Sequence, residues 1–158
     1  MNVRPDPSKV LRDHLAKLVG QRCWTVIGGR GNGSRVTIDF GQMISKPPRY
    51  EREFLIFILG CSWRFEHSDK TVCTWRDSEK KIALRMRDCE GLRILKINIT
   101  GPSNDLRVEF DKGYSLFLFC DQSEDADPME NYSIRFHQEW FTVGPGKTIE
   151  RETQRPRN

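Results

Sequence analysis

The sequence contains no hydrophobic run long enough to cross a membrane. Its longest uninterrupted apolar stretch extends only from Phe54 to Leu59, whereas a spanning helix needs about 20 such residues. No signal-peptide pattern opens the chain, and charged residues make up 30% of it. The sequence therefore predicts a protein without a membrane segment.

Paired cysteine motifs are also missing. The five cysteines are an odd number, and no two of them form a C-x-x-C pair. Several lie in apolar or alternating stretches, where a free thiol behaves as a small buried hydrophobe. This usage argues against a disulfide framework and predicts a reducing, cytoplasmic location. Cys61, His67 and Cys73 are evenly spaced, but they lack the tight pairs of zinc sites, so no metal site is predicted.

Patterns that would indicate catalysis are absent as well. There are only three histidines, and none stands in a known nucleophile–base pattern with a cysteine or serine. The segment Asp121 to Pro128 places acids at calcium-loop positions, but Ala126 stands where that loop needs glycine and Tyr132 where it needs glutamate. No catalytic residue and no cofactor is predicted, and a non-enzyme is favoured over an enzyme.

A glycine-rich stretch, VIGGRGNGSRV over residues 26–36, invites comparison with a phosphate-binding loop. Gly28 and Gly33 have the required spacing, but Ser34 replaces the lysine that contacts the phosphates. The alternation after it predicts a strand, whereas a phosphate-binding loop leads into a helix. Because Asn32-Gly33 is a strong hairpin signal, the stretch is predicted to be a hairpin tip.

Hydrophobic periodicity predicts two helices within a chain of mostly extended segments. The helical patterns cover residues 8–19 and 78–89, ending at Gly20 and Gly91. Strands are predicted at about 22–27, 36–40, 54–59, 61–66, 71–75, 92–99, 106–110, 114–120, 131–136 and 139–143.

The two halves of the chain resemble each other. Gly20 matches Gly91, the stretch 36–40 matches 106–110, and 53–63 aligns with 130–140, which makes Trp63 and Trp140 equivalent. The sequence predicts a β-rich α+β domain over residues 1–143, with a first repeat at about 8–75 and a second at about 78–143. These helix-plus-antiparallel-meander units would pack with pseudo-two-fold symmetry as a sandwich or partly open barrel. Residues 144–158 are predicted to be a flexible basic tail.

The resemblance to a known family rests on four stretches: L-V-G-Q, LGCSWRFE, DLRVEFDKG-x-x-L and the later Glu139-Trp140. They resemble motifs of a family of small bacterial proteins that contain a domain of unknown function. In that family each half carries a Leu-x-Phe-Asp-Gly-x-x-Leu hairpin and closes on a tryptophan. The first half of this chain departs from the pattern, because Gly41-Gln42-Met43 replaces the Asp-Gly turn. The resemblance implies a fold rather than an activity, and some proteins of this style neutralise secreted toxins.

Charge distribution provides the remaining functional signal. The net charge is +4, much of it near the ends, while segment 41–52 is basic and segment 121–130 is acidic. Two oppositely charged loops would orient a protein partner. The binding residues predicted on these loops are Arg49, Tyr50, Arg52, Asp121, Glu124, Asp125 and Asp127.

The leading hypothesis is therefore a non-enzymatic protein-interaction module, of the immunity type or a regulator of a partner. One alternative is a nucleic-acid or anion binder that uses Arg30, Arg35 and the basic tail. Another is a small-ligand binder or hydrolase with a pocket between the repeats. The oligomeric state stays open.

Overall fold

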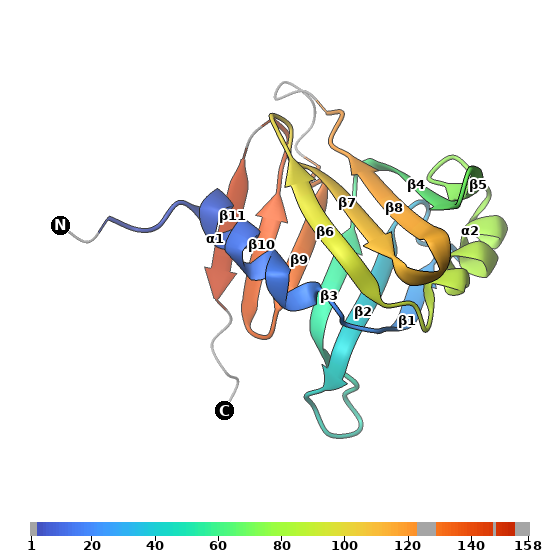
Figure 1. Cartoon of the computed structure of the whole chain (residues 1–158), viewed down its shortest axis with the longest axis horizontal. Coiled ribbons are helices and arrows are strands. Elements are labelled where there is room, and N and C mark those ends of the chain that lie inside the picture. The colour runs from blue at the N-terminus through green and yellow to red at the C-terminus, as the bar shows by residue number, and fades with distance from the viewer. Residues whose placement is uncertain (1–2, 123–128, 147, 154–158) are drawn as a thin grey trace.

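Two antiparallel sheets and two helices form the protein (Figure 1). The structure is a computed structural model and describes residues 3–122, 129–146 and 148–153. The strand order is β1-β2-β3-β9-β10-β11 in the six-stranded sheet and β5-β4-β8-β7-β6 in the five-stranded sheet. Each sheet therefore combines three consecutive strands from one half of the chain with strands from the other half. Neither sheet closes into a barrel.

The strands are short and alternate buried with exposed side chains, as expected for sheets with one face in the core. The six-stranded sheet consists of β1 (Cys23–Gly28), β2 (Val36–Met43), β3 (Arg52–Ile58), β9 (Tyr132–Phe136), β10 (Glu139–Val143) and β11 (Ile149–Thr153). The five-stranded sheet consists of β4 (Ser62–His67), β5 (Lys70–Thr74), β6 (Ile94–Thr100), β7 (Asp105–Phe110) and β8 (Tyr114–Phe119).

The core lies between the inner faces of the two sheets. Phe40 of β2 stacks on Phe110 of β7 with ring centroids 6.5 Å apart. Ile38 and Ile56 of the six-stranded sheet and Leu116 of the five-stranded sheet have no solvent exposure. Complete burial of one such side chain contributes about 1.5–3 kcal/mol to folding, so the inner faces hold the two sheets together.

Both helices pack at the sides of this sandwich. Helix α1 (Pro7–Leu15) follows the capping residue Asp6 and contacts β6 and β11, while α2 (Glu79–Arg85) follows the capping residue Ser78 and contacts β1 and β5. A 3₁₀ turn continues each helix, and the apolar stripes predicted from the sequence face the core. None of the helices in the described residues is long and apolar enough to cross a membrane.

The helix ends join the two halves of the chain through reciprocal hydrogen bonds. The N–H of Gly20 donates to the carbonyl of Ile94 (2.7 Å), and the N–H of Gly91 donates to the carbonyl of Cys23 (2.8 Å). Both glycines have positive φ angles, 83° and 90°, which a residue with a side chain rarely adopts. Between them, Arg22 and Arg93 form an isolated antiparallel bridge.

Part of the stretch 144–158, which was predicted to be a flexible tail, forms a strand. Ile149–Thr153 forms β11, which pairs with β10 along its whole length, and Arg151 Nη2 lies 3.0 Å from a carboxylate oxygen of Glu139. The sequence did not predict this edge strand, because the stretch is highly charged and contains glycines. Charged side chains are common on such strands because they discourage pairing with other molecules.

The sequence alignment of Trp63 with Trp140 was wrong. Trp63 lies in β4 of the five-stranded sheet and is 1% exposed, whereas Trp140 lies in β10 of the six-stranded sheet and is only half-buried. The aligned segments 53–63 and 130–140 contain β3 and β9, which pair directly with each other. Both are extended runs that end near a tryptophan, and this similarity placed neighbouring strands in equivalent positions.

Candidate binding pocket

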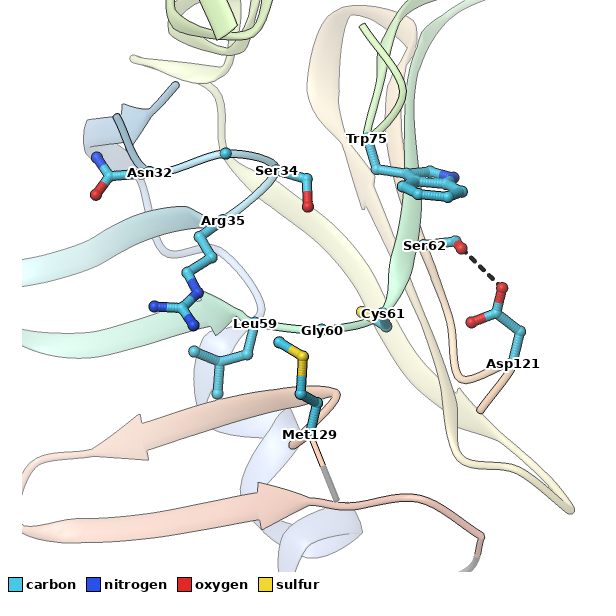
Figure 2. A pocket seen from close by; sticks show the side chains of 11 residues that line it. Asn32, Ser34, Arg35, Leu59, Gly60, Cys61, Ser62, Trp75, Asp121 and Met129 are labelled. Carbon is cyan, nitrogen blue, oxygen red and sulfur yellow. Dashed lines mark hydrogen bonds between the residues drawn. The ribbon is translucent and has the colours of Figure 1, made fainter. Parts of the chain in front are cut away.

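A cavity of about 440 Å³ opens at the end of the sandwich where β3 leads into β4 (Figure 2). Four connections meet there: the loop between β1 and β2, the crossover between β3 and β4, the loop that follows β5, and the connection between β8 and β9. The lining residues are Asn32, Gly33, Ser34, Arg35, Leu59, Gly60, Cys61, Ser62, Trp75, Asp121 and Met129. The cavity thus collects residues from both halves of the chain.

The glycine-rich stretch forms the tip of the β1–β2 hairpin, as predicted. The backbone N–H groups of Gly31 and Gly33 both donate to the carboxylate of Glu79, at 2.7 and 3.0 Å. Successive N–H groups of this kind form an anion-binding concavity. The glycines therefore do hold an anion, but the anion is a side chain of the same protein at the start of α2.

A buried tryptophan fixes the position of this loop. The indole Nε1–H of Trp63 donates to the carbonyl of Ser34 at 2.8 Å. Beside it, the side-chain amide of Gln122 donates to the carbonyl of Gly60 at 2.7 Å. Gly60 is tightly enclosed, because a Cβ at this position would lie 2.9 Å from the carbonyl oxygen of Glu130. The crossover is therefore held on both sides, which makes the cavity wall well defined.

Opposite charges face each other across the cavity. Figure 2 shows Arg35 on one side and Asp121 on the other, and no ion pair joins them in the described part of the chain. Asp121 accepts a hydrogen bond from the hydroxyl of Ser62 at 2.7 Å, which orients its carboxylate. A bound group with a positive and a negative end could contact both residues.

An indole provides the largest apolar surface at this site. Trp75 follows β5 and is 39% exposed, and its backbone N–H donates to the carbonyl of Trp63 at 3.1 Å. Leu59 and the half-exposed Met129 lie on the facing side in Figure 2. Exposed tryptophan beside methionine is typical of surfaces that bind other proteins.

The thiol in the wall is held in its protonated form. Burial raises the pKa of Cys61 well above its usual range, and the nearby Cys120 and Asp121 add to this effect. Burial likewise raises the pKa of Cys73 and of Cys120 to about 12. Because the thiolate is the reactive form, these cysteines act as apolar packing groups, and Cys61 does so in the cavity wall.

The structure separates Asp121 of the acidic segment from the basic segment 41–52, although the sequence predicted that these two charged segments together orient a protein partner. Arg52 begins β3, whereas Leu59 just beyond the other end of β3 donates to the carbonyl of Asn131. The basic loop with Arg49 and Tyr50 thus lies at the opposite end of β3 from Asp121. Their alignment was also wrong, because segment 41–52 joins neighbouring strands of one sheet and the segment after β8 crosses to the other sheet.

The predicted binding residues are therefore dispersed. Asp121 lines the cavity, Arg49 and Tyr50 are exposed at the far end, and Arg52 lies half-buried over the ring of Trp24. Glu124, Asp125 and Asp127 lie outside the described residues. Sequence reasoning missed Ser62 and Trp75, and it named Arg35 only for an anion-binding surface. Trp75 carried one usable signal, since it stands at the end of a predicted strand beside turn residues.

No three His, Cys, Asp or Glu side chains of the described segments come together in a way that would hold a metal ion. Comparison of the chain with protein-family models, with curated proteins and with solved structures finds no significant match.

Proposed function

We propose that this protein is a protein-interaction module and that the cavity beside Trp75 receives a segment of a partner protein. The observation that carries the proposal is the pair of opposite charges, Arg35 and Asp121, on either side of an exposed indole. Tryptophan and arginine are the side chains most enriched among residues that dominate binding energy at protein interfaces.

Each lining group has a definite role in this proposal. The Arg35 guanidinium donates to backbone carbonyls or to a carboxylate of the partner, because it carries five N–H donors and no acceptor. The Asp121 carboxylate, oriented by Ser62, accepts from a lysine or arginine. The Trp75 ring covers an apolar side chain between these two contacts. A short polar segment with one apolar residue fits this arrangement.

We also infer that the chain consists of two copies of one unit that exchange their last strands. The supporting observations are the reciprocal hydrogen bonds of Gly20 and Gly91 and the matching irregularities in β1 and β6, where each strand bulges opposite a phenylalanine of the next. In this scheme Trp63 of β4 corresponds to Tyr132 of β9. The interaction site then arises where one copy's hairpin loop diverged.

Site-specific photocrosslinking tests the proposed function. A benzoylphenylalanine placed at Trp75 reports contacts of the cavity, and the same group at Tyr50, which is 70% exposed, reports contacts of the opposite end of β3. In lysate of the source cells we expect the Trp75 position to capture one protein that the Tyr50 position does not. Capture of that protein should fall at least about tenfold in Arg35→Glu and in Asp121→Asn, since contacts to charged groups contribute about 1.5–3 kcal/mol.

Matched charge changes at the other end serve as controls. Arg49→Glu alters an exposed arginine by the same two charges as Arg35→Glu, so it should leave capture unchanged. Asp121→Asn keeps an acceptor for Ser62 and therefore preserves the local fold. Equal loss in Arg49→Glu, or capture at Tyr50 alone, would contradict a partner site in this cavity.

A further inference from the structure

A second, separate feature lies at the other end of β3, where three arginines surround one tryptophan. Trp24 of β1 is 42% exposed, and the guanidinium carbons of Arg22 and Arg52 each lie 4.5 Å from the centre of its ring. Arg93 joins this group because it bridges to Arg22 where the two halves of the chain meet. Together with Gln21, Gly41, Gln42 and Met43, these residues line a cavity of about 520 Å³.

The backbone holds two of the three arginines, Arg52 and Arg93, in place before any ligand binds. Arg52 reaches across β2 and donates through Nη1 to the carbonyl of Gly41 at 3.0 Å. Arg93 donates through Nη1 to the carbonyl of Gly20 at 3.2 Å. Gly41 has a φ of 84°, and a Cβ there would lie 3.0 Å from the ring of Phe54. Since the donors of Arg52 and Arg93 are already oriented, binding would cost little additional ordering of these two side chains.

The charge of this cluster is poorly compensated. Asp39 is the one carboxylate within ion-pair distance of these three guanidinium groups in the described part of the chain, 3.8 Å from Nε of Arg52. Arg22 has neither a hydrogen bond nor an ion pair from its side chain to any described residue. The three guanidinium groups and the Asp39 carboxylate together therefore carry a net positive charge, and N–H donors remain available in the cavity.

Three of the five other arginines that lie over aromatic rings differ, because an acid of the protein pairs with them, whereas Arg76 and Arg135 have no ion pair within the described residues. Arg107 covers Phe117 and is paired with Glu109 at 2.8 Å, and Arg151 lies over Phe141 and is paired with Glu139. Arg64 likewise covers Phe117 and pairs with Glu66. In each case the same chain supplies the acid. Among the described residues no acid pairs with the guanidinium groups of Arg22 and Arg93, which leaves N–H donors in the cavity available to an anion from another molecule.

We propose that the cavity formed by Arg22, Arg52 and Arg93 around Trp24 binds the phosphate group of a nucleotide, either free or within a single-stranded nucleic acid. Guanidinium groups match phosphate oxygens in geometry and bind them in a fork-like manner. Three of them around one cavity suit a tetrahedral anion with several oxygens. The exposed part of the indole provides a surface on which a base can stack. This site is distinct from the cavity beside Trp75 and does not depend on its function.

Calorimetric titration with three probes tests the proposal: inorganic phosphate, adenosine monophosphate and a short oligothymidylate. We expect at least one probe to bind, and we expect Arg22→Ala and Arg93→Ala each to weaken its binding by about tenfold or more, because hydrogen bonds between charged groups contribute about 1.5–3 kcal/mol. Both side chains are exposed, so these variants should keep the fold, as circular dichroism would verify. Arg107→Ala, which removes an arginine from the other sheet, is the matched control and should bind like the parent protein.

The three probes also separate the sources of the phosphate. Binding of the oligonucleotide alone, with a salt dependence that becomes shallower by about one unit in each arginine variant, would support recognition of a strand. Tighter binding of adenosine monophosphate than of inorganic phosphate would support a free nucleotide, and equal binding would support a plain phosphate site. The proposal is overturned if no probe binds at millimolar concentration, or if Arg107→Ala weakens binding as much as Arg22→Ala.

Discussion

The tips of the β1–β2 and β6–β7 hairpins are each held by a hydrogen bond from an aromatic side chain, but their surroundings differ. In the β1–β2 tip the carbonyl of Ser34 accepts from Trp63 Nε1, and in the β6–β7 tip the carbonyl of Asn104 accepts from the Tyr132 hydroxyl, both at 2.8 Å. Tyr132 is completely buried, and burial raises its pKa so that the hydroxyl stays protonated and remains a donor. An aromatic side chain from the strand after the crossover thus anchors each tip.

Their surroundings diverge from that point. Asn104 is 6% exposed, and its carbonyl also accepts from the thiol of Cys120 at 3.5 Å, so the anchored end of the second tip is packed into the protein while Gly101 and Pro102 are exposed. The first tip contains more glycines and is hydrogen-bonded to Glu79 at the start of α2. It also lines the open cavity beside Trp75. The same kind of aromatic anchor is therefore found in a short tip with a buried asparagine and in a longer tip beside an open cavity.

The largest expected effect is loss of the anchor of the first tip. Trp63→Ala should lower the free energy of unfolding by about 3–5 kcal/mol, because it leaves a cavity in the core and an unpaired carbonyl at Ser34. Trp140→Ala should cost clearly less, since Trp140 is half-buried. Urea denaturation of both variants measures this, and equal losses would restore the sequence-based equivalence of the two tryptophans.

A smaller loss is expected at the glycine that joins the first tip to α2. Gly29 has a φ of 65°, and a Cβ there would lie 2.1 Å from the carbonyl oxygen of Glu79. Gly29→Ala should therefore destabilise the protein by about 2–4 kcal/mol, through both backbone strain and the clash. Gly33→Ala isolates the strain alone, since φ is 61° there and a Cβ would meet nothing within 4 Å. Thermal unfolding that ranks Gly33→Ala as the more harmful change would contradict the packing of the tip against α2.

The anchor of the second tip should contribute less by its hydrogen bond alone. Tyr132→Phe keeps the ring in the core and removes only the donor to Asn104, so the free energy of unfolding should fall by about 1–2 kcal/mol. Chemical denaturation would show this, with Tyr114→Phe as a control at a half-buried tyrosine. An unchanged free energy of unfolding in Tyr132→Phe would mean that the hydrogen bond from Tyr132 does not stabilise the second tip.

The smallest effect is expected from the carboxylate in the glycine cradle. Glu79→Gln removes a charge that accepts from two N–H groups at a solvent-exposed position, so stability should fall by only about 0.5–1 kcal/mol. The backbone amide resonances of Gly31 and Gly33 should shift strongly, whereas Glu109→Gln on the other sheet should leave them in place. Unchanged amide shifts in Glu79→Gln would contradict the cradle.

Much of the fold was accessible from local patterns. The periodicities predicted both helices and the ten strands from β1 to β10, because amphipathic segments reveal which face is buried. The hairpin at Asn32-Gly33 was predicted correctly, since its turn chemistry is local. Strand β11 was missed because an exposed edge strand carries charged residues and no strong apolar alternation.

The candidate site was much less accessible. The sequence singled out Asp121 and Arg35 for different reasons, but it did not place them across one cavity, and it did not name Trp75 or Trp24. It also grouped Arg49 and Asp121, which lie at opposite ends of β3. Residues so far apart in the sequence meet only through strand pairing, and periodicity carries no information about which strands are neighbours.

The sequence by itself determined which segments form the helices and strands up to β10, which faces are buried, and that the glycine loop is a turn, because these depend on residues close together in the chain. Tertiary structure alone decided that β4 and β5 cross to the sheet of β6–β8 while β9 and β10 cross to the sheet of β1–β3. That exchange brings Arg35 to the same cavity as Asp121, and the junction of the helix ends brings Arg22 to Arg93. Both are long-range pairings, selected by the burial of two complementary sheet faces rather than by any local preference.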